Sequence, residues 1–315
     1  MRSFQRLIFF SILGTYLVIL AGAIVRGTGS GLGCPDWPRC FGQWVPPMDI
    51  SELPANYKDV YKIAGKTIAD FDPFKTWTEY VNRLLGVILG FIITLIFVFS
   101  FGLKRYEKNL PWFSAGLLFL VIIQGGVGAL VVSTHLKPFL ITIHMFLAVI
   151  LLFGLLYLNK YCQNLEDTSL VPPLDPKALM LTRILTFLTF GQVMMGTQVR
   201  QQVDHLMRDT MTATHETVIS QLNAMFYIHR TFSVIIVGLF VYLLSYLVKN
   251  RFNRTAFFLT TLAFLSVMGN VVTGIIMNYF DFPANAQPPH LFLGVLTLGL
   301  LYSSSLNLRG SLLED

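Results

Sequence analysis

The chain has 315 residues, of which 54% are hydrophobic and 13% are charged, and its mean hydropathy is +0.62. An average soluble domain has roughly a quarter charged residues, so this chain has about half the usual supply for a water-facing surface. The composition excludes a soluble globular enzyme, a disordered chain and a small disulfide-rich protein. The formal charge of +6 is expected on loops beside a membrane, and we expect no nucleic-acid binding.

Apolar residues gather in eight stretches, each of about 20 residues, which is enough for a helix to cross a hydrocarbon core of about 30 Å. None of them alternates like a barrel strand, and backbone polar groups in lipid then leave helices as the other choice. The sequence therefore predicts an all-α integral membrane protein. The expected spans, in chain order, are 7–25, 83–103, 112–132, 139–158, 179–198, 229–248, 257–277 and 290–306.

The basic residues predict the orientation of these spans. An even number of spans puts both termini on one side, and Arg2, Arg6, Lys104, Arg105 and Lys249 all flank spans on that side. By the positive-inside rule, both termini are expected to be cytoplasmic. The first span follows Arg6 without the features of a cleavable signal or a transit peptide, so we expect a multi-pass protein of the bacterial inner membrane.

The second half of the chain repeats the first. The string YVNR at 80–83 matches YIHR at 227–230, and His144 matches His290. Gln124 matches Asn270 and Gly128 matches Gly274 at the same offset of about 146, and GAIVR at 22–26 matches GTQVR at 196–200 at a larger offset, as expected if the first outer loop is longer than its counterpart. We therefore expect two pseudo-symmetric four-helix bundles, 1–160 and 161–315, related by an axis along the membrane normal.

Three histidines begin predicted spans, and two of them lie in the second half. His229 and His290 are expected at one membrane depth, where two facing imidazoles could bind one haem iron. Arg200 and Arg230 are then candidates for binding the propionates. Alternatively, each histidine bonds water or lipid headgroups. Zinc is less favoured, because no Cys, Asp or Glu clusters with these histidines within the spans.

The first half departs from this pattern at one position. His144 is retained, but Asn82 stands where the repeat places His229. An amide is a poor ligand for haem iron, so a macrocycle here is expected to be five-coordinate through His144 or to take another donor. The other interpretation is that Asn82 caps a helix N-terminus. By the repeat, Arg26 and Arg83 are the propionate candidates of this half.

An acid and a cysteine pair occur in the first half alone. Glu79 is one helical turn before Asn82, and either it forms an i,i+4 salt bridge with Arg83 or it handles protons or water beside a macrocycle. Cys34 and Cys40 flank a Pro-Trp-Pro turn in the predicted outer loop. This spacing favours a disulfide, with a redox-active pair as the sharper alternative.

The residues 22–26, followed by TGSGLGCPDWP at 28–38, resemble the first span and loop of haem A synthases. The string EYVNR at 79–83 is similar to that family's E-x-x-H-R element, with Asn82 in place of the usual histidine. The resemblance implies oxidation of a methyl group of haem O to the formyl group of haem A. It also implies haem B on His229 and His290, and a substrate haem in the first half, where Glu79 is essential and the cysteines take part.

The implied partners are haem O, a haem O synthase and an electron acceptor, and a homo-oligomer stays open. A b-type dihaem electron carrier or quinone oxidoreductase is the main alternative. It would use the same histidines without needing Glu79 or the cysteine loop. A transporter is a further alternative, suggested by the repeated halves. The spans contain no Pro-broken helix pair and no charged path, which argues against transport.

Overall fold

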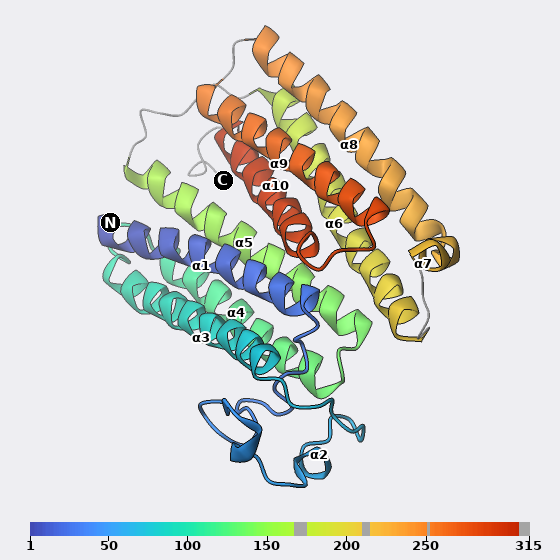
Figure 1. Cartoon of the computed structure of the whole chain (residues 1–315). Coiled ribbons are helices and arrows are strands. Elements are labelled where there is room, and N and C mark those ends of the chain that lie inside the picture. Colours follow the sequence, from blue (N-terminus) through green and yellow to red (C-terminus); the bar gives the residue numbers. More distant parts are fainter. Residues whose placement is uncertain (167–174, 210–214, 251–252, 309–315) are drawn as a thin grey trace. The chain divides into compact units, whose positions relative to one another are not determined.

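The computed structural model describes residues 1–166, 175–209, 215–250 and 253–308 (Figure 1). Within these ranges, eight helices are long and apolar enough to cross a membrane, which confirms the predicted all-α class and the eight spans. They are α1 (Arg2–Gly27), α3 (Pro73–Gly102), α4 (Leu110–Ser133), α5 (Pro138–Glu166), α6 (Pro176–Asp209), α8 (Ala224–Lys249), α9 (Arg254–Tyr279) and α10 (Gln287–Leu308). The shorter elements are the 3-10 turn η1 (Ile50–Glu52), α2 (Tyr57–Val60) and α7 (His215–Gln221).

Two helices extend ten residues or more past the predicted spans, and a helix cap explains the first extension. The first, α3, begins at Pro73 instead of residue 83, because the Asp72 side chain accepts a hydrogen bond from the backbone N–H of Lys75 and so caps the helix. The second, α6, continues beyond residue 198 to Asp209. Hydropathy detects only the apolar part of such helices, so it missed the turns of α3 that carry Glu79.

The chain divides into two compact units, Arg6–Leu151 and Met1–Gln5 with Leu152–Asp315. In the second unit, α10 packs against α6 and α9, and α8 packs against the same two helices. Side chains of α8 and α10 can therefore meet in the space that the four helices share. Polar contacts also join α9 to α10: Ser266 donates to the carbonyl of Leu293 at 3.0 Å, and the hydroxyls of Thr260 and Ser304 are 2.9 Å apart.

In the first unit, residues 28–72 form a packed segment beyond the ends of α1 and α3, which we call the loop segment (Figure 1). Cys34 and Cys40 form a disulfide, as the first of the two interpretations predicted. Both cysteines are buried against Phe41 and Tyr57, and the Tyr61 hydroxyl donates to the Phe41 carbonyl at 2.8 Å. The segment thus has an apolar core of its own.

Candidate functional site

Two imidazoles meet between the helices of the second unit. His229 comes from the first turns of α8 and His290 from the first turn of α10, and their ring centroids are 6.5 Å apart. An iron bound by a nitrogen of each ring would lie about 3 Å from each ring centre, which requires a separation of about 6 Å. The observed spacing therefore fits one metal between the two rings.

A glycine on the neighbouring helix makes room for each of these rings. A Cβ added at Gly196 on α6 would lie 3.1 Å from Cε1 of His229, and one added at Gly274 on α9 would lie 3.3 Å from Cε1 of His290. Both distances are tighter than ordinary van der Waals contact. The two glycines are therefore needed for the rings to pack where they do.

Hydrogen bonds determine the tautomer of His290. Its Nδ1 is 3.0 Å from the backbone oxygen of Asn270 and 3.0 Å from the hydroxyl oxygen of Thr273. A carbonyl oxygen can only accept, so Nδ1 carries the proton. In the neutral imidazole, Nε2 then has a free lone pair, which is the donor that a metal requires.

The donor set suits haem better than a bare metal ion. Within the residues that the structure describes, no group of three or more His, Cys, Asp or Glu side chains could hold a metal ion. Two imidazoles would supply two nitrogen ligands, and a porphyrin would bring the other four nitrogens with it. The His229–His290 pair and its glycine contacts therefore fit a haem.

The first unit contains a single-histidine version of this arrangement. Gly128 on α4 would place a Cβ 3.2 Å from Cε1 of His144 on α5, just as Gly274 would with His290. At the fourth equivalent place, Gly22 on α1 lies against Asn82, with 3.8 Å between the added Cβ and Oδ1. Asp72 caps α3 and Asn82 lies well inside that helix, so the N-cap interpretation of Asn82 is wrong.

The buried carboxylate of Glu79 joins α3 to the disulfide loop. The side chain is part of the buried core, and the salt bridge to Arg83 is present, with 2.5 Å between Oε1 and the guanidinium. The other oxygen, Oε2, accepts the backbone N–H of Cys34 at 3.0 Å. Glu79 therefore contacts both the arginine of its own helix and a residue of the disulfide.

A model of the COX15-CtaA family, described as cytochrome oxidase assembly protein, matches residues 5–302. The chain belongs to this family. A multi-pass membrane protein with eight candidate spans agrees with that membership.

Curated relatives of this family member carry the name "Heme A synthase". The protein of Shewanella oneidensis is 33% identical over 186 residues, which cover 58% of this chain and 52% of that protein. The proteins of Orientia tsutsugamushi and Rickettsia prowazekii are each 26% identical, over 90% and 94% of this chain and 89% and 95% of their own length. The matched region thus spans about half of the Shewanella relative and nearly all of the other two.

The four arginines predicted to face propionates have different surroundings in this family member. Arg83 donates to the backbone carbonyls of residues 34, 36 and 39 as well as to Glu79. Arg200 pairs with Asp204 at 2.8 Å, and Arg230 lies over the rings of Phe226 and Tyr227. Arg26 is in the last turn of α1. Arg83 would have to exchange one of its contacts to meet a propionate.

Sequence reasoning missed the side chains that support the histidines. Gln124 Nε2 donates to the backbone carbonyl of His144 at 2.9 Å, and Gln192 Nε2 does the same to His229 at 2.7 Å. Each glutamine is four residues before the glycine that faces the histidine ring, and so is Asn270. A recurring amide-x-x-x-Gly pattern on the long helix that precedes each of these histidines was the signal that could have identified them.

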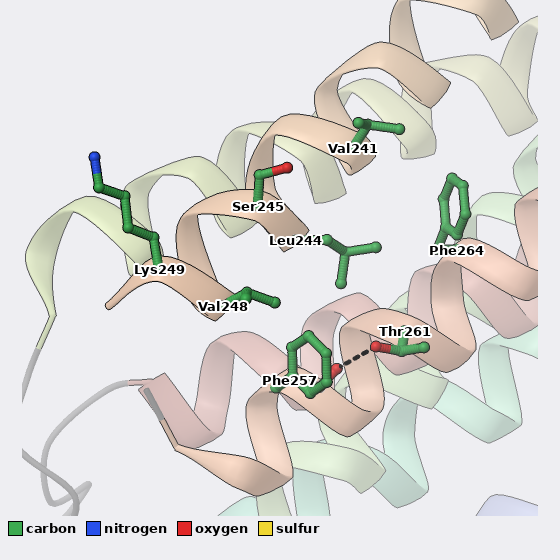
Figure 2. Close-up of a pocket in the computed structure, with 8 residues that line it drawn as sticks. All are labelled: Val241, Leu244, Ser245, Val248, Lys249, Phe257, Thr261 and Phe264. Carbon is green, nitrogen blue, oxygen red and sulfur yellow. Dashed lines mark hydrogen bonds between the residues drawn. The ribbon is translucent and has the colours of Figure 1, made fainter. Parts of the chain in front are cut away.

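A separate groove of about 560 Å³ lies between the later turns of α8 and the early turns of α9 (Figure 2). Its lining is mostly apolar and consists of Val241, Leu244, Ser245, Val248, Lys249, Phe257, Thr261 and Phe264. None of these side chains is a haem ligand or an acid, so we assign the groove no part in the site.

Proposed function

We propose that this chain is a haem A synthase, which oxidises a methyl group of haem O to the formyl group of haem A. The observation that carries the proposal is the His229–His290 ring pair, whose 6.5 Å separation fits a haem iron, in a member of the cytochrome oxidase assembly family. In the first unit, the buried Glu79 contacts the disulfide loop, and this acid supports an enzyme rather than a simple electron carrier.

The architecture that we propose follows the sequence repeat. It has two pseudo-symmetric four-helix bundles, residues 1–160 and 161–315, with both termini cytoplasmic in a bacterial inner membrane. The same pairing of glycine with histidine at Gly128, Gly196 and Gly274 supports the internal repeat. The proposed partners are haem O, a haem O synthase that delivers it and an electron acceptor, and a second copy of the chain is a further candidate partner.

Haem B is the proposed cofactor of the second half. His229 and His290 would hold its iron, and Arg200 and Arg230 are the candidates for its propionates. When bound, haem B supplies electron-accepting chemistry. The chain's contribution is to fix the two imidazoles at the required separation and to surround them with apolar helix faces.

Haem O would bind in the first half, with His144 as the ligand and Asn82 in place of a second histidine. Arg26 and Arg83 are the candidates for its propionates. Conversion of the methyl group to a formyl group takes up one water and releases four protons and four electrons. The electrons pass to the electron acceptor. The role of Glu79 is to accept protons or to position water, a task suited to a carboxylate close to a bound substrate.

The test is product formation in membranes that also contain a haem O synthase, with the extracted haems identified by chromatography. Glu79→Gln keeps the shape and an oxygen that can accept the Cys34 N–H, but it removes the proton acceptor. We expect haem A formation to fall about 100-fold or more while haem B stays bound. Glu52→Gln is the control, because Glu52 accepts hydrogen bonds only within the loop segment.

Near-normal turnover of Glu79→Gln would contradict the role of Glu79. Two haem B molecules per chain, with no haem O or haem A, would favour the b-type electron carrier. No haem in a folded preparation would remove the ligand assignments of His229 and His290.

A further inference from the structure

Three histidines pack against a glycine of the preceding long helix, but their Nδ1 atoms are treated differently. Nδ1 of His290 contacts both the Asn270 carbonyl and the Thr273 hydroxyl. Nδ1 of His144 and Nδ1 of His229 are buried, and no hydrogen-bond partner is found for them among the described residues. The difference therefore lies at the Nδ1 atom of each ring.

The sequence beside each facing glycine explains this difference. Thr273 directly precedes Gly274, whereas Val127 precedes Gly128 and Met195 precedes Gly196. All three residues occupy the same position on their helices relative to the glycine that the ring contacts. A hydroxyl is present at this position only beside His290.

The contacts of the Thr273 hydroxyl suit an acceptor for the His290 proton. Its oxygen is 3.0 Å from the carbonyl oxygen of Gly269 and 2.9 Å from that of Asn270, so its own proton can go to either of these. A lone pair of the oxygen is then directed to Nδ1–H. Two acceptors, the hydroxyl and the Asn270 carbonyl, share one proton and hold the ring in place.

We propose that Thr273 is a positioning residue that holds the His290 ring with Nε2 towards the haem iron, and that it makes the second-half haem a retained cofactor. The inference rests on the proposed haem ligation by His229 and His290. Hydrogen bonding to the free ring nitrogen raises the basicity of a metal-bound imidazole, and loss of such a partner weakens metal binding 10–100-fold in comparable sites. His229 lacks this contact, so His290 alone provides it for the second-half haem, whereas the first-half haem would depend on His144, which has no such contact.

The experiment compares Thr273→Val with Thr273→Ser in the full-length purified protein. Valine has nearly the shape of threonine without the hydroxyl, and serine restores the hydroxyl. The matched control is Thr261→Val on the same helix, about 18 Å away by the helical rise of 1.5 Å per residue. Thr261 donates to its own helix, to the Phe257 carbonyl at 2.9 Å, and lines the groove in Figure 2.

The readouts are the rate of haem B transfer to apomyoglobin and the midpoint potential of the bound haem. We expect Thr273→Val to lose haem B about tenfold faster, since the Asn270 carbonyl still accepts one bond. The potential should become more positive, because a less basic imidazole stabilises ferric iron less. Thr273→Ser and Thr261→Val should behave like the unchanged protein.

Val127→Thr is the second variant, because it introduces the hydroxyl beside His144. It should increase the haem O that co-purifies with the protein when a haem O synthase is present, as measured by the ratio of haem O to haem B. An unchanged ratio, or identical transfer rates and potentials for Thr273→Val and Thr261→Val, would overturn the inference. Absence of haem from the purified unchanged protein would instead overturn the proposed ligation by His229 and His290.

Discussion

Arg83 and Arg230 hold the same place in the sequence repeat, yet their surroundings differ completely. Arg83 is mostly buried, pairs with Glu79 and donates to three carbonyls of the loop segment. Arg230 is exposed and lies 5.7 Å and 5.4 Å from the ring centroids of Phe226 and Tyr227 on its own helix. One arginine fastens a folded loop, and the other covers aromatic rings.

This comparison shows how a duplicated plan can acquire two tasks. The first unit has one candidate haem ligand in His144, an acid in Glu79 and a loop held on α3, which suits a site where a substrate reacts. The second unit has Phe226 at the position of Glu79, and it has two histidines with a hydrogen-bonded ring between α9 and α10. That combination suits permanent binding of a cofactor.

The largest effect that we expect comes from the ligands themselves. His290→Ala should lose most of the haem B, since it removes the one ligand of that haem whose ring is held by hydrogen bonds, whereas His144→Ala should leave haem B bound. The reduced-minus-oxidised spectrum of each purified variant measures this difference. Stoichiometric haem B in His290→Ala would show that the two units do not divide the tasks in this way.

Asn82→His would make the first unit resemble the second. A second imidazole facing the substrate iron should convert that haem from a five-coordinate to a low-spin bis-histidine form. Electron paramagnetic resonance of the haem O-loaded protein distinguishes the two forms, and Asn82→Gln is the control that keeps an amide. If Asn82→His has the spectrum of the unchanged protein, residue 82 does not face the iron.

Gly33→Ala tests whether the loop segment must dock on α3. A Cβ at Gly33 would lie 2.5 Å from the backbone oxygen of Lys75, so the loop would have to shift, at a cost of about 1–3 kcal/mol. We expect a lower Tm and faster proteolysis within the loop segment. The control is Gly86→Ala on α3, where the added Cβ has nothing within 4 Å, so this variant should not lower the Tm.

The smallest expected effect compares the glycines. Gly274→Ala would put a methyl group 3.3 Å from the His290 ring, whereas Gly22→Ala would meet Asn82 at an ordinary 3.8 Å. We therefore expect a few-fold faster haem B loss for Gly274→Ala and no change for Gly22→Ala, in the apomyoglobin transfer assay. Equal rates for the two variants would mean that the His290 ring is not held by this glycine.

The helices could be predicted from the sequence more completely than the site. Lipid requires long apolar helices, so hydropathy alone located all eight. The start of α3 was missed because its first turns are polar and are defined by the Asp72 cap, and Asn82 was consequently considered for that cap. A helix cap is a weaker sequence signal than a long apolar stretch, so the apolar stretch determined the predicted start of this helix.

For the site, the repeat identified His229 and His290 but not the residues that support them. A threonine in a membrane helix ordinarily bonds its own backbone, and Thr273 does so as well as contacting His290. Which side chain faces the ring depends on how α9 is rotated against α10, and hydropathy does not determine that rotation. The role of Thr273 therefore appears only in three dimensions.

The contacts between the loop segment and α3 also set an order of synthesis. The Thr76 hydroxyl donates to the Gly33 carbonyl, Glu79 accepts the Cys34 N–H, and Arg83 donates to the Cys34 carbonyl. Residues 33 and 34 leave the ribosome before residues 76–83, so the loop must wait for α3 to complete its hydrogen bonds. The loop segment can therefore complete its fold only after α3, the second membrane span, has been synthesised.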